Sequence, residues 1–307
     1  MKVNIKEQFR KGEITKPAFI DAMYQQHQEL FEYCNLLQQT DLGKIEITAD
    51  GILFTSKEDQ IKFYCTKADK RTAPFEIMNF EAYETEDAGL LYQVIKDSKF
   101  IFDIGANIGW YSIGLAKKQP QATIYSFEPL LQTYSSLEKN VALNEMQNIV
   151  LHNFGFSKEN TTLKFYTSPH TSVSNSAENI SGEADIIETV CEVKRMDDYV
   201  KANNLTIDVI KCDVEGAELF VFEGGLQTIS EQQPIIFCEM LRKWAAKFNY
   251  HPNDIIQLLA TAGYQCFVNN GKDQLAILKE VTPETTQTNY FFLHPNKHQS
   301  IIQQYGA

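Results

Sequence analysis

From about residue 90 onward, the chain alternates short apolar runs with amphipathic helical stretches, and this alternation constrains the fold more than any other feature. The apolar runs predict strands at 100–103, 123–127, 149–154, 209–213 and 235–239. Several of them are apolar at every position, as in strands that helices cover on both faces. Helical stretches are predicted at 110–118, 131–143, 219–229 and 253–262. This order of elements predicts an α/β fold built on a mostly parallel sheet.

Two segments depart from the alternation. Residues 264–268 and 290–293 are strand-like without a clear helix between them, which predicts an antiparallel pair at the end of the sheet. Residues 161–166 and 189–194 are strand-like around a segment rich in Ser, Thr and Asn. This second pattern predicts a hairpin inserted at about 155–207 between the third and fourth parallel strands.

The first 85 residues follow a different pattern. Residues 1 to about 40 have helical periodicity, and strand-like runs follow at 44–48, 51–54 and 61–65. The dipeptide Asp50-Gly51 is a hairpin signal between the first two runs. We therefore predict an N-terminal helical and β cap at 1–85 and a main domain at 86–307.

Composition narrows the class of partner. The 307 residues include 40 acidic and 28 basic side chains, for a net charge of −12, so we expect neither nucleic acid nor a membrane as a partner. The six cysteines are scattered singly and form no Cys-x-x-Cys pair. We therefore expect no metal site, and we expect the cysteines to be reduced thiols. No secretory signal and no apolar run long enough to span a bilayer is present. We expect a cytoplasmic protein.

A glycine-containing loop follows the first predicted strand of the main domain. In the stretch DIGANIG at 103–109, Asp103 ends the strand, Gly105 permits a tight turn and Gly109 begins a helix. A dinucleotide fingerprint would place a glycine where Asn107 stands, and a side chain there obstructs a pyrophosphate. This disfavours a nucleotide-cofactor oxidoreductase, which stays the second hypothesis. S-Adenosylmethionine carries no phosphate, and Asp103, Asn107 and the glycine backbone suit its carboxylate and ammonium groups.

Two further strand ends offer groups for a nucleoside. Glu128 ends the second strand 25 residues after Asp103 (128 − 103), where a carboxylate accepts hydrogen bonds from both ribose hydroxyls. Phe127 either flanks the adenine or belongs to the core. Asn153 and Gly155 end the third strand, where this architecture places adenine contacts, although a structural role is equally compatible with their position.

The fourth strand carries unusual charges. Because side chains alternate along a strand, Lys211 and Asp213 share a face of a segment that is otherwise apolar, and buried charges need partners. At this strand end they would face the transferred methyl group, together with Glu215 and with Glu239 of the fifth strand. We expect the three carboxylates Asp213, Glu215 and Glu239 to form an acidic wall that binds substrate hydroxyls, steers the cofactor ammonium or acts as a base. The alternative for Lys211 is a structural salt-bridge network.

Four motifs taken together resemble one family. They are DIGANIG at 103–109, FEP at 127–129, RMDDY at 195–199 and KCDVEGAE at 211–218, and the resemblance to the FkbM-type methyltransferases extends from about residue 83 to 292. It implies a class I, Rossmann-like fold whose mostly parallel seven-stranded sheet has a C-terminal antiparallel strand. It also implies S-adenosylmethionine as cofactor and methyl transfer to oxygen, commonly a hydroxyl of a sugar or a polyketide-type product. By the same resemblance, Glu84 closes over the methionine end of the cofactor.

An acceptor hydroxyl must lose its proton, so a base is useful. Candidates are Asp213, Glu215, Glu239 and His170, the last in the inserted segment, where a solvent-exposed histidine without function is the alternative. Nothing in the spacing of the carboxylates demands a metal ion. A non-catalytic binding module on a methyltransferase-like fold remains a third hypothesis, a homo-oligomer is compatible with the sequence, and no motif identifies the acceptor.

Overall fold

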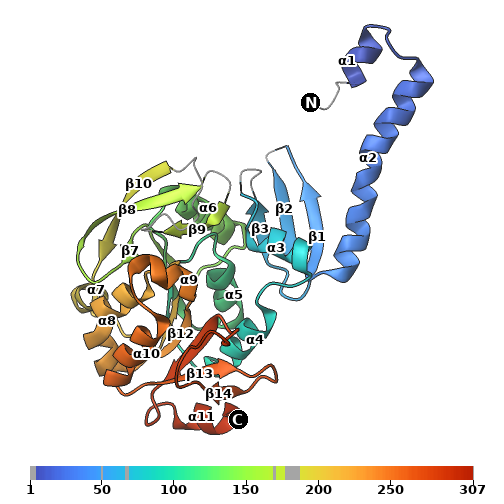
Figure 1. Cartoon of the computed structure of the whole chain (residues 1–307). Coiled ribbons are helices and arrows are strands. Elements are labelled where there is room, and N and C mark those ends of the chain that lie inside the picture. The colour runs from blue at the N-terminus through green and yellow to red at the C-terminus, as the bar shows by residue number, and fades with distance from the viewer. Residues whose placement is uncertain (1–4, 50, 66–68, 169–170, 177–186, 307) are drawn as a thin grey trace.

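The computed structural model describes residues 5–49, 51–65, 69–168, 171–176 and 187–306. Its centre is an eight-stranded sheet in the order β14-β13-β15-β12-β11-β4-β5-β6 (Figure 1). The strands of this main sheet are β4 (Phe100–Ile104), β5 (Thr123–Phe127), β6 (Ile149–His152), β11 (Val209–Cys212), β12 (Ile235–Glu239), β13 (Gln265–Asn269), β14 (Leu275–Ile277) and β15 (Asn289–Leu293).

Strand direction defines where a ligand can bind. Strands β6, β5, β4, β11 and β12 are mutually parallel, whereas β15 is antiparallel to both β12 and β13. The chain builds outward from β4 to β5 and β6 on one side and to β11 and β12 on the other. The order therefore reverses beside β4, and ligands of open α/β sheets bind at such a point. We expected seven strands; β14 adds an eighth because it pairs with the outer edge of β13.

Helices bury both faces of the main sheet. One face packs on α7 (Met196–Asn203), α8 (Glu218–Gln232) and α10 (Pro252–Thr261), and the other on α4 (Thr85–Val94) and α5 (Trp110–Lys118). The neighbours Ile101 and Phe102 of β4 show this division, because they are both fully buried but belong to opposite clusters. Three further helical segments complete this region: α6 (Leu131–Leu143), α9 with η1 (Arg242–Ala245 and Ala246–Phe248) and α11 (Gln299–Tyr305).

The predicted insertion forms a small sheet of its own. Its strands are β7 (Gly155–Phe156), β8 (Thr161–Ser168), β9 (Thr171–Ser176) and β10 (Ile187–Lys194), in the order β7-β10-β8-β9. The two predicted strands correspond to β8 and β10, which pair antiparallel. We call these four strands the insert sheet. The insert sheet holds more than the predicted hairpin because β7 pairs in parallel with β10 and β9 pairs antiparallel with β8.

The N-terminal region consists of two helices, α1 (Ile5–Arg10) and α2 (Lys16–Gln39), and a sheet of β1 (Leu42–Ile47), β2 (Ile52–Ser56) and β3 (Lys62–Cys65), followed by α3 (Ala73–Phe80). The sheet shares a core with the main domain, since Phe54 and Phe63 cluster with Ile113 of α5 and Leu137 of α6. Helix α2 instead extends away from the body of the protein, which it contacts at β1 (Figure 1). The domain boundary at residue 85 stays a prediction.

Candidate active site

A cavity of about 280 Å³ lies at the carboxyl ends of β4, β5 and β11, where the strand order reverses. Its walls come from the loop after β4, the end of β5, the segment after β11, the insert sheet and α8. The predicted site residues that line it are Gly105, Asn107, Glu128, Gly155, Asp213 and Glu215. The cavity therefore brings together residues from four separate segments, which is the arrangement expected of a ligand site in this architecture.

The glycine loop is held tightly against the end of β11. Gly105 has a φ of +77°, and a Cβ at this position would lie 1.8 Å from the carbonyl oxygen of Asp213, so only glycine fits. Gly109, with a φ of +96°, begins α5, and a Cβ there would lie 2.7 Å from Cδ1 of Leu137 in α6. Gly109 does not line the cavity, contrary to the role we expected. Its lack of a side chain serves the packing of α5 against α6.

Asn107 presents an unused acceptor to this site. Its backbone takes the left-handed conformation, with a φ of +49°, and its N–H donates a 3.1 Å hydrogen bond to Oε2 of Glu128. Its side-chain Oδ1 is buried and has no hydrogen-bond partner within the described residues. A buried polar atom without a partner is unfavourable. A ligand with a hydrogen-bond donor would satisfy it.

Glu128 closes the floor of the cavity between the first two strands. Each carboxylate oxygen accepts one backbone N–H, Oε2 from Asn107 at 3.1 Å and Oε1 from Leu130 at 3.0 Å. Burial raises the pKa of the Glu128 carboxyl to about 7, although both hydrogen bonds and Lys211 oppose the shift. Each oxygen keeps a second lone pair, so the side chain can still accept hydrogen bonds from a ligand.

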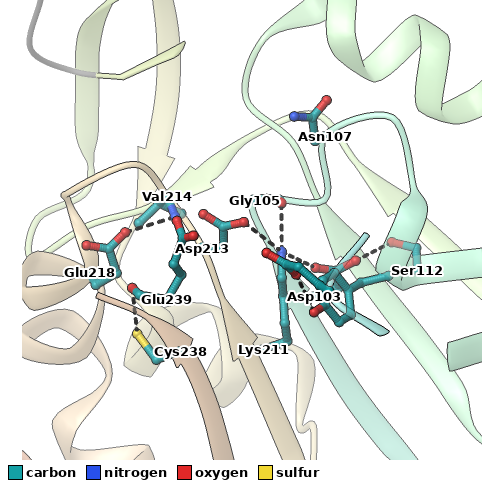
Figure 2. Close-up of polar contacts among 12 residues, drawn as sticks. Asp103, Gly105, Asn107, Ser112, Lys211, Asp213, Val214, Glu218, Cys238 and Glu239 are labelled. Atoms are coloured by element: carbon teal, nitrogen blue, oxygen red, sulfur yellow. Dashed lines mark hydrogen bonds and ion pairs between the residues drawn. The ribbon is translucent and has the colours of Figure 1, made fainter. Parts of the chain in front are cut away.

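Lys211 and Asp103 form a buried ion pair behind the cavity wall (Figure 2). Nζ of Lys211 lies 3.1 Å from Oδ1 of Asp103, 3.1 Å from the Gly105 carbonyl oxygen and 3.7 Å from Oδ2 of Asp213. The lysine side chain is only 4% exposed and the Asp103 side chain is fully buried. Burial by itself lowers the pKa of Lys211, but the adjacent carboxylates of Asp103 and Asp213 outweigh it and raise the pKa.

This arrangement bears on two predictions. Neither Asp103 nor Lys211 lines the cavity, and both side chains are buried, which favours a structural network over direct ligand contact. A contact of Asp103 with the cofactor and a contact of Lys211 with the substrate stay predictions. Asp103 instead accepts a 2.5 Å hydrogen bond from the Ser112 hydroxyl, which in turn accepts a 2.7 Å bond from Ser126. Lys211 ties the glycine loop to the end of β11 and is a positioning residue. The physical reason is burial: a charged pair removed from water needs its own polar partners.

The acidic wall is only partly exposed to the cavity. Asp213 and Glu215 line it, whereas Glu239 lies behind them at the end of β12. Burial and the negative charges of Asp213 and Glu215 raise the pKa of Glu239 well above its ordinary value, which favours the neutral acid. A role of Glu239 as a catalytic base stays a prediction.

Glu84 also lies outside the cavity wall. Its Oε2 accepts a 2.5 Å hydrogen bond from the hydroxyl of Tyr111 in α5, and burial raises its pKa. The residue stands at the start of α4 with a left-handed φ of +50°. Asp213 is among the charges that raise this pKa, so Glu84 lies within electrostatic reach of the β11 end. That Glu84 closes over the methionine end of the cofactor stays a prediction.

The adenine contacts need correction as well. Phe127 is fully buried in an aromatic cluster with Phe102 and Phe156, so it cannot flank a ligand, and its alternative role in the core is the right one. Asn153 does not line the cavity, because its amide nitrogen donates to the carbonyl oxygens of Glu128 and Pro129 and braces that turn. Of the third-strand residues, Gly155 lines the cavity. His170 lies outside the described residues.

Sequence reasoning missed the apolar wall of the cavity. Leu163 and Phe165 of β8 contribute from the insert sheet, and Phe220 of α8 and Phe248 of η1 contribute from the opposite side. Leu163 and Phe165 are two residues apart in a strand, which places them on one face, and this spacing was visible in the sequence. The contributions of Phe220 and Phe248 had no sequence signal, since Phe220 belongs to an ordinary helical pattern and Phe248 lies between the predicted elements.

In the described part of the chain, no group of three or more His, Cys, Asp or Glu side chains is arranged to hold a metal ion. Helices long and apolar enough to cross a membrane are likewise absent from those residues.

The sheet order and the glycine loop define an α/β protein of methyltransferase-like fold. The chain belongs to the Methyltransferase FkbM domain family, whose pattern matches residues 103–266, more than half of the sequence. The predicted resemblance to this family is thereby confirmed.

Individual relatives match a smaller part of the chain than the family pattern does. Methyltransferase 1 of Beauveria bassiana (strain ARSEF 2860) is 30% identical over 146 residues, and the match covers 42% of this chain and 59% of that protein. Methyltransferase sdnD of Sordaria araneosa is 30% identical over 159 residues, and the match covers 42% of this chain and 61% of that protein. The chain thus spans less than two thirds of the length of these relatives. A crystal structure of Methyltransferase FkbM from Methylobacillus flagellatus KT is 20% identical, with a TM-score of 0.40 over 64% of this chain and 44% of that one.

Proposed function

We propose that the chain transfers a methyl group from S-adenosylmethionine to a hydroxyl oxygen of a sugar, a glycan or a small secondary metabolite. The observation that carries the proposal is the cavity at the β4, β5 and β11 ends, where the glycine loop, Glu128 and Asp213 meet in a chain of the FkbM family. The names of two relatives, both methyltransferases, agree with this class of reaction.

The polar atoms around the cavity fit this cofactor. Oδ1 of Asn107 and Oδ1 of Asp213 are buried acceptors that no described residue satisfies, and S-adenosylmethionine offers an ammonium group and two ribose hydroxyls as donors. Glu128 would hold the ribose through its remaining lone pairs, and Asp213 would face the ammonium or the acceptor. When bound, the cofactor supplies a methyl group on a positively charged sulfur, which is already an activated leaving group.

The protein's own contribution is positioning and proton removal. Lys211 fixes the distance between the glycine loop and Asp213, which holds both walls of the cavity in place. Asp213 is 31% exposed and Glu215 lines the same wall, so these two carboxylates are the candidate bases for an acceptor hydroxyl. The aromatic side chains of Phe220 and Phe248 shield the adjacent part of the cavity from water.

The test is a screen for methyl transfer from radiolabelled S-adenosylmethionine to monosaccharides, oligosaccharides and polyketide-type alcohols. With an acceptor in hand, Asp213→Asn should lower kcat about 100-fold or more, the usual contribution of a general base, and change cofactor affinity much less. Glu215→Gln is the matched comparison, because it alters the other carboxylate of the same wall. Equal kcat values for both variants and the unchanged chain would show that neither carboxylate removes the proton.

A further inference from the structure

Helix α2 is the feature that the proposed function leaves unexplained. It has 24 residues, none of which is buried, and it extends away from the body of the protein (Figure 1). Several large apolar side chains on it are exposed: Ile20 53%, Tyr24 60%, Leu30 52% and Phe31 65%. Most helices in proteins are stabilised by packing of an apolar face along their length. Helix α2 instead contacts the short α1 and, at its C-terminal end, β1, where Leu37 packs against the core of the N-terminal sheet.

Five apolar side chains of α2, together with His27, follow a coiled-coil spacing. Successive positions alternate by three and four residues, as in a heptad seam, and two aromatic residues border the seam. We call these residues the α2 stripe: Ile20, Met23, His27, Leu30, Cys34 and Leu37, bordered by Tyr24 and Phe31. The acidic residues of the helix, Asp21, Glu29 and Glu32, all lie outside the stripe. A seam of this spacing is built to receive another helix with the same spacing.

We propose that the occupant of the α2 stripe is the same helix of a second copy of this chain, packed antiparallel. The direction follows from charge. Residues 5–16, at the far end of α2, carry four basic and two acidic side chains, a net charge of +2, whereas the whole chain carries −12 and the remainder therefore −14. Antiparallel packing places each positive end beside the negative body of the other copy. Parallel packing would bring two positive ends together and two negative bodies together.

The stripe is symmetric about its own midpoint. In antiparallel register Ile20 lies opposite Leu37, Met23 opposite Cys34 and His27 opposite Leu30, so each contact occurs twice about a two-fold axis. A helix of 24 residues is about 36 Å long, so one helix pair buries less than the roughly 800 Å² per partner of a standard stable interface. The dimer is therefore concentration-dependent, with a dissociation constant on the order of micromolar.

Sedimentation velocity of the full chain at concentrations of about 1 to 100 µM covers the range in which a dimer with a micromolar dissociation constant forms. The unchanged chain should pass from monomer to dimer over this range. Leu30→Glu should weaken dimerisation at least about 30-fold, as loss of a central interface residue does. The control Gln25→Glu adds the same charge on the opposite face of the helix and should leave dimerisation unchanged. A chain that stays monomeric throughout, or two variants that behave alike, would overturn the proposal. Because α2 has no buried residue, neither change should unfold the body.

Disulfide trapping tests the direction. Cys34 is exposed, whereas the other five cysteines are buried. In the antiparallel register the two Cys34 residues are 11 positions apart along the helix axis, about 16 Å, too far for a disulfide. Mild treatment with oxidised glutathione should therefore not link the unchanged chain but should link Met23→Cys, whose introduced thiol faces Cys34 of the partner subunit. Linkage of the unchanged chain would establish the parallel arrangement, and no linkage of Met23→Cys would contradict the register.

Discussion

Replacing Gly105 by alanine tests the claim that the glycine loop and the β11 end form one rigid unit. The new Cβ would lie 1.8 Å from the Asp213 carbonyl oxygen, so the two backbone segments must move apart by well over 1 Å. Two interactions join these segments. The Asp213 N–H donates to the Ile104 carbonyl oxygen at 3.0 Å, and Lys211 donates to the Gly105 carbonyl oxygen at 3.1 Å. A movement of that size breaks both.

The expected loss of stability has two parts. A non-glycine residue in the left-handed region is less favourable by about 1–2 kcal/mol, whatever its surroundings. Breaking the hydrogen bond between the Asp213 N–H and the Ile104 carbonyl oxygen, and removing the Gly105 carbonyl as a partner of buried Lys211, adds about 1–3 kcal/mol. Gly105→Ala should therefore lower the free energy of unfolding by about 2–5 kcal/mol, measured by urea titration with far-ultraviolet circular dichroism.

Gly271 provides the matched control. Its φ is +78°, almost the same as that of Gly105, but a Cβ there meets nothing within 4 Å. Gly271→Ala should therefore show the conformational penalty alone, about 1 kcal/mol after the loss of unfolded-state entropy is included. A difference of less than about 1 kcal/mol between the two variants would refute the tight contact between Gly105 and Asp213.

Two further predictions concern buried charges. Lys211→Met leaves the Asp103 carboxylate without its cation and should lower the free energy of unfolding by about 3–5 kcal/mol, whereas Lys44→Met, in an exposed pair with Glu46, should change it by no more than about 1 kcal/mol. Similar values in urea titrations would mean that Lys211 is not the link between the loop and β11. Glu218 accepts hydrogen bonds from the N–H groups of Val214 and Gly216, and burial raises its pKa from 4.5 to about 7. Between these pH values the folded protein holds a proton that the unfolded chain releases, so stability should fall as pH rises from about 5 to 8. Relative to Glu218→Gln, the unchanged chain should lose on the order of 1–3 kcal/mol over that range, and parallel pH profiles would disprove the raised pKa.

The parallel part of the sheet was predictable from sequence because its strands are continuous apolar runs bounded by helices. β5 and β12 have the predicted bounds, as do α5 and α6. The functional edge was predictable for the same reason: once the strand ends are known, the topology brings Glu128 and Asp213 to one cavity. Short elements such as β14, with three residues, carry too little pattern to be recognised.

Side-chain direction at the strand ends was the part that sequence could not supply. Asp103 and Glu128 both end strands, yet only Glu128 lines the cavity, because the side chain of Asp103 turns toward Lys211 inside the protein. That difference depends on which buried cation lies nearby, and the contact joins β4 to β11 across 108 residues of sequence (211 − 103). Phe127 was ambiguous for a similar reason, since an aromatic side chain suits both a core and an adenine pocket.

Isothermal titration calorimetry with S-adenosylmethionine tests the central claim most directly. We expect S-adenosylmethionine to bind saturably at one site per chain, and NAD not to bind. Glu128→Ala should bind S-adenosylmethionine about 10- to 100-fold more weakly, because it loses the hydrogen bonds between the carboxylate and the ribose. Glu223→Ala, on the exposed side of α8, is the control and should bind as the unchanged chain does. Failure to bind S-adenosylmethionine, or an affinity that Glu128→Ala leaves unchanged, would contradict the assignment of this cavity as the cofactor site.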